Sequence, residues 1–178
     1  PSRVADIWGG GDSSTPVHMT VFNSKLYFQA SDGSGGGQDY ELWVYDGVNP
    51  PSLVKDIQSG AEGSFPLDMA VFNSKLYFQA YDAVSTGHEL WVYDGTNDPS
   101  LVADIWSGLG DSYPESLVVF NSKLYFSANG NNGADNELWV YDGTNAPSMV
   151  LDINNETHGS FPDQFAVFNN KLYFSAGD

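Results

Sequence analysis

The sequence predicts an all-β fold: a β-propeller of four repeats, with about 48 residues per blade and an incomplete last blade. The first observation is a segment that begins with proline, passes through KLYF and, in three copies, continues to ELWVYDG; successive copies start 50, 48 and 48 residues apart. The second is that apolar residues alternate or run together over short stretches and nowhere follow a helical period. We treat the chain as a single repeat domain with copies at 1–50, 51–98, 99–146 and 147–178.

Each complete copy contains four expected strands. They are expected at Leu67–Phe72, Lys75–Ala80 and Glu89–Gly95 in the second copy, and at Ser100–Ile105 at the start of the third. The loop Asn73-Ser74 indicates a tight hairpin, because asparagine tolerates the positive φ of a type I′ turn.

The ELWVYD strand is apolar on both faces, since Leu90 and Trp91 point to opposite sides of the sheet. A sheet buried on both faces fits blades arranged around an axis. A stacked β-solenoid or a β-sandwich is the alternative architecture.

The strand count leaves one strand missing at the chain ends. The KLYF strand occurs four times, whereas the ELWVYDG strand occurs three times. If the ring closes, an N-terminal strand at Ser2–Ile7 completes the blade begun by Phe165–Ala176, and that blade still lacks its third strand. An unpaired strand edge invites another strand, so self-association through this edge is expected.

The chain is strongly acidic, with 23 Asp and Glu against 6 Lys and Arg and a formal charge of −17. Such a surface repels phosphate backbones and anionic lipids, which argues against nucleic-acid partners. Membrane insertion is not expected either, because no stretch approaches the ~20 apolar residues of a membrane span.

The recurring ELWVYDGTN, preceded by KLYFxA and followed by PSLVxDI, resembles the ELWxxDGT repeat proteins. The match is specific at Glu41-Leu42-Trp43 and Asp46-Gly47 and at their counterparts, and it covers essentially the whole chain. The resemblance implies a secreted, extracellular or cell-surface propeller-like repeat. It implies no catalytic residues, so none is assigned here.

No common enzyme motif is present: the sequence has no HExxH, no phosphate-binding loop, no GxSxG and no cysteine. Glu41, Glu89 and Glu137 recur by symmetry, and we interpret them as cross-strand or loop-capping residues. We therefore expect no catalytic residues and no enzyme. A hydrolase or lyase at the propeller mouth, using His18 and Asp68, is the remaining enzymatic alternative.

Trp8 and Trp106 are candidate ligand platforms. Gln58 and Asn154 occupy the same position in the other two copies, so this position is not expected in the core. An indole offers a flat apolar face to a sugar ring and an N–H to a polar partner. The alternative is a partly covered loop residue.

A second candidate site is a ring of four unlike polar residues on the first strand of each copy. Its members are His18, Asp68, Ser116 and Gln164. Innermost strands converge in a propeller, so these side chains could hold a cation, water or a small ligand. Ordinary solvated strand ends are the alternative interpretation.

The loops between KLYF and ELW are rich in oxygen ligands, which suit Ca²⁺. The candidate metal ligands are Asp32, Asp39, Asp82 and Asp135. Aspartate also forms turns, so turn formation is the alternative role. Ca²⁺ is the only cofactor expected.

These observations favour a non-enzymatic extracellular binding module. The activity we expect is multivalent, lectin-like binding of glycans or cell-surface polysaccharide, by aromatic stacking and by polar contacts from acidic loops. The alternative is a structural or self-assembling module of a surface layer or adhesin.

Overall fold

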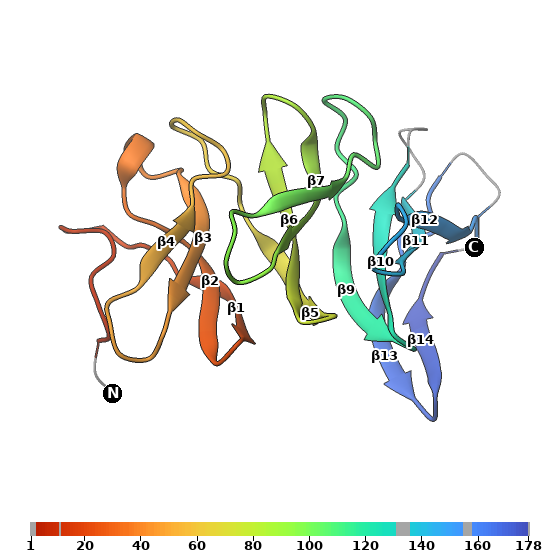
Figure 1. Cartoon of the computed structure of the whole chain (residues 1–178). Coiled ribbons are helices and arrows are strands. Elements are labelled where there is room, and N and C mark those ends of the chain that lie inside the picture. Colours follow the sequence, from red (N-terminus) through yellow and green to blue (C-terminus); the bar gives the residue numbers. More distant parts are fainter. Residues whose placement is uncertain (1–2, 11, 131–135, 155–157, 178) are drawn as a thin grey trace.

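The computed structural model describes residues 3–10, 12–130, 136–154 and 158–177. It is an all-β structure of three four-stranded antiparallel sheets and one two-stranded sheet, which repeat about every 48 residues. The sheets follow one another in sequence order, and the first and last lie at opposite ends of the row (Figure 1).

Within each complete sheet the strands pair in sequence order. The first sheet contains β1 (Val17–Phe22), β2 (Lys25–Ser31), β3 (Tyr40–Tyr45) and β4 (Ser52–Lys55). The second contains β5 (Leu67–Phe72), β6 (Lys75–Asp82), β7 (Gly87–Tyr93) and β8 (Ser100–Ala103). The third contains β9 (Glu115–Phe120), β10 (Lys123–Asn129), β11 (Asn136–Tyr141) and β12 (Ser148–Leu151). The last sheet contains β13 (Asp163–Phe168) and β14 (Lys171–Ser175), and a short 3₁₀ helix, η1 (Ser34–Gly36), lies between β2 and β3.

The predicted hairpin turn is confirmed. Asn73 and Ser74 have φ values of 47° and 57°, both in the left-handed region that a type I′ turn requires. The same conformation recurs at Asn23-Ser24, Asn121-Ser122 and Asn169-Asn170. This turn fixes the register of the first two strands in every sheet.

The core lies between the sheets, as apolar residues on both strand faces predict. Phe22, Tyr27 and Leu42 of the first sheet pack against Leu76 and Phe78 of the second. The junction between the second and third sheets repeats this arrangement with Phe72, Tyr77 and Leu90 against Leu124 and Phe126. Because the second sheet buries apolar side chains against both of its neighbours, adjacent sheets stabilise one another.

The predicted N-terminal strand does not form over residues 3–7. Ile7 instead packs against Phe28 and Trp43 on the outer face of the first sheet. Ile57 and Ile105 occupy the corresponding positions at the two inner junctions. The physical reason is pairing: residues 3–7 have no ELWVYD strand beside them, and a strand needs a partner for its backbone groups.

Candidate functional site

The repeated glutamates are buried and bind the linker to the next sheet. Glu89 Oε2 accepts hydrogen bonds from the Ile105 amide at 2.9 Å and from Ser112 Oγ at 2.6 Å. Glu89 Oε1 accepts from the amides of Trp106 and Ser112, both at 3.3 Å. These contacts agree with the loop-capping interpretation of the glutamates.

The same arrangement recurs in the other two complete sheets. Glu41 accepts hydrogen bonds from Ile57, Gln58 and Ser64, and Glu137 from Ile153 and Ser160. Burial raises the pKa of Glu41 and of Glu89 to about 7, although the hydrogen bonds oppose this rise.

The first sheet adds two further carboxylates beside its glutamate. Oxygen atoms of Asp39, Glu41 and Asp56 lie within 4.8 Å of one another. Asp32 and Ser34 line the same pocket, which has a volume of about 70 Å³. We call Asp39, Glu41 and Asp56 the acidic cluster. Three carboxylates at this spacing could hold a metal ion.

Asp39 is the member of the acidic cluster that has a buried oxygen atom without a hydrogen-bond partner. Its Oδ2 accepts a hydrogen bond from Ser34 Oγ at 2.5 Å, whereas its Oδ1 is buried without a hydrogen-bond partner. Burial raises the pKa of Asp39 against the effect of the Ser34 hydrogen bond, and the charges of Asp56 and Asp32 raise it further. A bound cation would remove this repulsion and give Oδ1 a partner.

The predicted calcium ligands fall into three places. Asp32 and Asp39 line the pocket of the acidic cluster. Asp82 belongs to the second sheet and caps its own loop, where its carboxylate accepts hydrogen bonds from the Val84 amide at 2.8 Å and Ser85 Oγ at 2.6 Å. Asp135 lies outside the described residues.

Sequence reasoning missed two members of the acidic cluster, Glu41 and Asp56. The linker between the first two sheets brings Asp56 beside Asp39, a contact between residues 17 positions apart. One signal was visible: Asp39 precedes Glu41 by two positions, and side chains two positions apart share a face of a strand. In the second sheet the residue equivalent to Asp39 is Gly87. The second sheet therefore has no carboxylate at this position of the cluster.

The candidate tryptophans Trp8 and Trp106 are both half-buried. The indole of Trp8 lies against Gly33 and Gly37 in the loop that carries Asp32 and Asp39. The indole of Trp106 lies against Gly110. A Cβ atom at any of these glycines would collide with the indole, so the glycines allow the close approach.

At the equivalent position of the second copy, Gln58 is buried and its Oε1 accepts a hydrogen bond from the Ala83 amide at 2.9 Å. The prediction that this position stays outside the core therefore does not hold for Gln58. The side chain here reaches the loop after the second strand of the next sheet, a contact that the sequence does not reveal.

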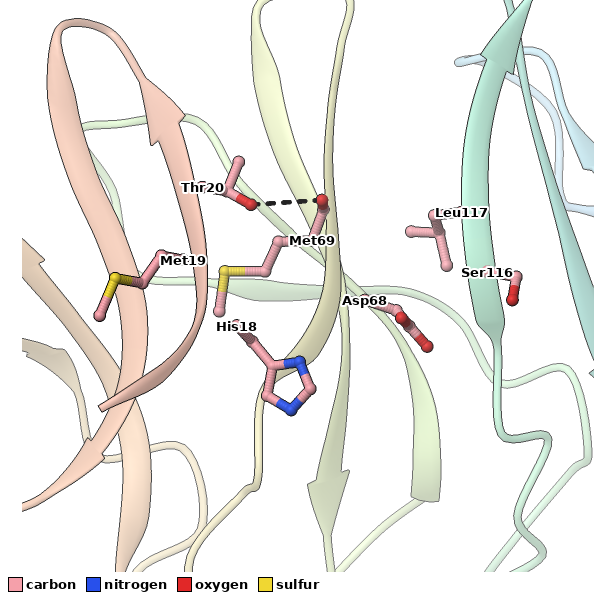
Figure 2. Close-up of a pocket in the computed structure, with 7 residues that line it drawn as sticks. All are labelled: His18, Met19, Thr20, Asp68, Met69, Ser116 and Leu117. Atoms are coloured by element: carbon pink, nitrogen blue, oxygen red, sulfur yellow. Dashed lines mark hydrogen bonds between the residues drawn. The ribbon is translucent and has the colours of Figure 1, made fainter. Parts of the chain in front are cut away.

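Of the four polar residues predicted to form a ring on the first strands, three line one pocket and the fourth does not. His18, Asp68 and Ser116 lie in a row across β1, β5 and β9 and line a pocket of about 230 Å³ (Figure 2). Gln164 is joined to them through Asp163, whose carboxylate accepts hydrogen bonds from Ser116 Oγ at 2.9 Å and Gln164 Nε2 at 3.0 Å.

A repeated backbone irregularity places these four residues. All four have φ between 51° and 56°, and the strand register shifts at each described bulge. A bulge with one residue in the left-handed region redirects its side chain, and such bulges are common next to sites. The alternation of apolar and polar residues in these strands does not predict the bulge.

Aromatic residues of the Ser-aromatic-Pro loops are a further feature that the sequence analysis did not assign. In the second sheet His88 lies between Tyr81 and Tyr113, at ring-centre distances of 4.5 and 4.6 Å, and its Nδ1 is 2.8 Å from Asp111 Oδ1. Phe161 is 63% exposed in the last copy. The signal was present in the sequence, because each of the last three copies places an aromatic residue between serine and proline.

Comparison with known proteins gives no relative: no family model, no curated protein and no solved structure matches the chain. Within the described part of the chain, no helix is long and apolar enough to cross a membrane.

Proposed function

We propose that this chain is a non-enzymatic, extracellular β-propeller module that binds glycans, with Ca²⁺ held by the acidic cluster. The observation that carries the proposal is the unpartnered, buried Oδ1 of Asp39 beside two other carboxylates. The propeller part is supported by the contacts of β5 with β1 and β9 and of β9 with β13, since the innermost strands of neighbouring blades contact one another in a propeller.

Calcium fits the acidic cluster better than softer metals do. Asp39, Glu41 and Asp56 supply only oxygen atoms, and Ca²⁺ takes six to eight oxygen ligands, some of them from water. Three protein carboxylates leave coordination positions free. Pairs of sugar hydroxyl groups are suitable ligands for those positions, and the net charge of −17 attracts the cation.

The stacking surface for the sugar is Trp8, with Trp106 as its counterpart two copies further on. Trp8 lies against the loop that contributes Asp32 and Asp39 to the pocket, so one loop connects the indole and the carboxylates. A second platform on a rigid repeat would raise the apparent affinity for a polymer through effective concentration.

The assignment of the two tryptophans to sugar stacking is tested with the double variant Trp8→Ala/Trp106→Ala. The assay is affinity electrophoresis through gels that contain bacterial polysaccharides. We expect retardation of the wild type and a loss of at least about tenfold in affinity for the double variant, since stacking on each aromatic ring contributes about 1 kcal/mol. Leu109→Ala is the matched control, because Leu109 is exposed in the loop after Trp106. Equal retardation of the double variant and the control would remove Trp8 and Trp106 from the site.

A structural or self-assembling role is the second candidate function. Its specific support is β14, which among the described strands pairs only with β13. Sedimentation velocity over a wide concentration range tests this role, which requires larger species at higher concentration and is contradicted by a single monomeric species throughout.

A further inference from the structure

A pocket of about 400 Å³ lies between the third sheet and the start of β13. It is lined by residues of β9, β10 and β11 and by the end of the linker into β13, among them Glu115, Ser127, Asn136, Phe161 and Asp163. We call it the Phe161 pocket. Its volume is in the range of sites that hold small organic ligands. It is separate from the acidic cluster, which belongs to the first sheet.

The backbone around Phe161 is repeated at the other two junctions between sheets. At each junction the aromatic residue that stands between serine and proline donates its amide hydrogen to the carbonyl of a residue in the preceding sheet. These pairs are Phe65 with Tyr40, Tyr113 with His88 and Phe161 with Asn136, at 3.0, 3.2 and 2.9 Å. Asn136 therefore stands at the position of Tyr40 and His88.

At the first two junctions this position carries a ring that packs on the aromatic residue opposite. The ring centres of Tyr40 and Phe65 are 5.6 Å apart, and those of His88 and Tyr113 are 4.6 Å apart. Asn136 has no ring, so the third junction keeps the backbone arrangement without the first member of the aromatic pair.

Phe161 is the second member of that pair at the third junction. It is 63% exposed, whereas Tyr113 is 38% exposed. The covering ring belongs to β3 at the first junction and to β7 at the second, so the exchange in β11 of the third sheet leaves this face of Phe161 uncovered.

Two further exchanges in the third sheet make the pocket wider and more polar. They lie directly opposite each other in the strand register. The pair at this register is Val17 with Gln29 in the first sheet, Leu67 with Gln79 in the second and Glu115 with Ser127 in the third. Serine is smaller than glutamine, and Glu115 brings a carboxylate to a position that is apolar in the first two sheets. Three departures from the repeat therefore meet at one pocket.

The Phe161 pocket is acidic. Burial raises the pKa of Glu115, and the charges of Asp68 and Asp163 raise it further. The carboxylate of Asp163 already accepts hydrogen bonds from Ser116 and Gln164. Among the described residues that line the pocket there is no lysine or arginine. A cation beside Glu115 would therefore relieve an unfavourable charge.

We propose that the Phe161 pocket binds a small amine that carries an aromatic ring. The ring takes the place that Tyr40 and His88 occupy at the other junctions and stacks on Phe161. The ammonium group lies beside Glu115. A neutral sugar would leave the charge of Glu115 uncompensated, so an amine fits this pocket better. The inference goes beyond the glycan-binding function proposed above and does not depend on it.

The test is isothermal titration calorimetry of the whole chain with tyramine, a phenol joined to an ethylammonium group. We expect saturable binding that weakens as the salt concentration rises, since an ion pair contributes to it. Tyrosol, in which a hydroxyl group replaces the ammonium group, should bind at least about fivefold more weakly. Cyclohexylethylamine keeps the amine without the aromatic ring and should bind at least about threefold more weakly than tyramine.

Asn136→Tyr is the sharpest variant, because it gives the third sheet the residue that the first sheet has in Tyr40. The added ring should fill the space over Phe161 and weaken tyramine binding at least about tenfold. Phe161→Ala should weaken binding at least about fivefold. Its matched control is Phe168→Ala, which changes an equally exposed phenylalanine outside the pocket and should bind within about twofold of the wild type.

Glu115→Gln separates the effect of charge from that of shape. It should weaken tyramine binding at least about fivefold and leave tyrosol binding within about twofold. Glu62→Gln is the control for net charge, because Glu62 is exposed in the linker between the first two sheets. It should leave the binding of both compounds unchanged.

Absence of saturable tyramine binding by the folded chain would overturn the inference, as would equal binding by the wild type and Asn136→Tyr. Equal affinity for tyrosol and tyramine would overturn the assignment of an amine. Asp39→Asn should leave tyramine binding unchanged, because Asp39 belongs to the acidic cluster of the first sheet. Failure of the glycan-binding proposal would therefore leave this result intact.

Discussion

Replacing Glu89 with alanine is expected to lower the free energy of unfolding by about 3 kcal/mol, because buried amides that lose their acceptor cost about 1–3 kcal/mol each. Glu89 is fully buried and receives hydrogen bonds from Ile105, Trp106 and Ser112. Alanine leaves the amides of Ile105 and Trp106 without this acceptor, whereas Ser112 keeps the His88 carbonyl. It also releases the linker that joins the second and third sheets. Urea unfolding followed by circular dichroism measures the change.

The control is Glu62→Ala, which removes an exposed carboxylate from the linker between the first two sheets. It should change the free energy of unfolding by less than about 0.5 kcal/mol. If both variants lose the same amount, net charge rather than the buried hydrogen bonds determines the effect.

Glu41 and Glu89 make the stability of the protein depend on pH. The pKa of Glu89 is about 7 in the folded protein against 4.5 for an unperturbed glutamate. The folded state therefore binds more protons between these values, and the free energy of unfolding falls as pH rises from about 4.5 to 7, by about 3 kcal/mol per glutamate. Above pH 7 this contribution is constant. In calcium-free buffer Glu89→Gln should reduce this slope and leave the part that Glu41 contributes, and an unchanged slope would contradict the assignment.

The second large effect is the loss of calcium-dependent stabilisation in Asp39→Asn. With a dissociation constant of about 10⁻⁴ M, 10 mM Ca²⁺ raises the free energy of unfolding by about 2.7 kcal/mol, or several degrees in Tm. Asp39 contributes the one oxygen of the acidic cluster that is buried without a partner, so its loss should reduce this gain to below about 0.5 kcal/mol. Differential scanning calorimetry with calcium and with chelator measures it.

Asp82→Asn serves as the control for the calcium effect, since Asp82 caps a loop in the second sheet and does not line the pocket. It should keep the full response to calcium. In chelator Asp39→Asn should be at least as stable as the wild type, because the raised pKa of Asp39 marks its charge as unfavourable in the folded state. A full calcium response in Asp39→Asn would exclude the acidic cluster as the site.

Local patterns were sufficient to predict most of the strands. The strand expected at Leu67–Phe72 has the bounds observed for β5, and the Asn-Ser turn follows from the positive φ that both residues adopt. The expected strand at Ser100–Ile105 is shorter in the structure and ends at Ala103, because the amide of Ile105 donates to Glu89 instead of continuing the ladder. That hydrogen bond joins residues 16 positions apart, which a local pattern does not reveal.

The candidate site was predicted only where its residues are neighbours in the sequence. Asp32 and Asp39 stand in one loop, and their pairing in one pocket follows from proximity. Asp56 joins them through the linker, and Glu41 joins them from the start of β3. The positive φ of His18 and Asp68 likewise arises from a bulge that depends on pairing with the next strand. Contacts of this kind become visible only in three dimensions.

The most direct test of the central proposal is a glycan array probed with fluorescent wild-type protein and with Asp39→Asn, each in calcium and in chelator. The account predicts selective binding to one class of sugar by the wild type in calcium, and loss of that signal in chelator and in Asp39→Asn. A blank array with folded wild-type protein, or binding that is unaffected by both chelator and Asp39→Asn, would contradict a calcium-dependent glycan-binding function.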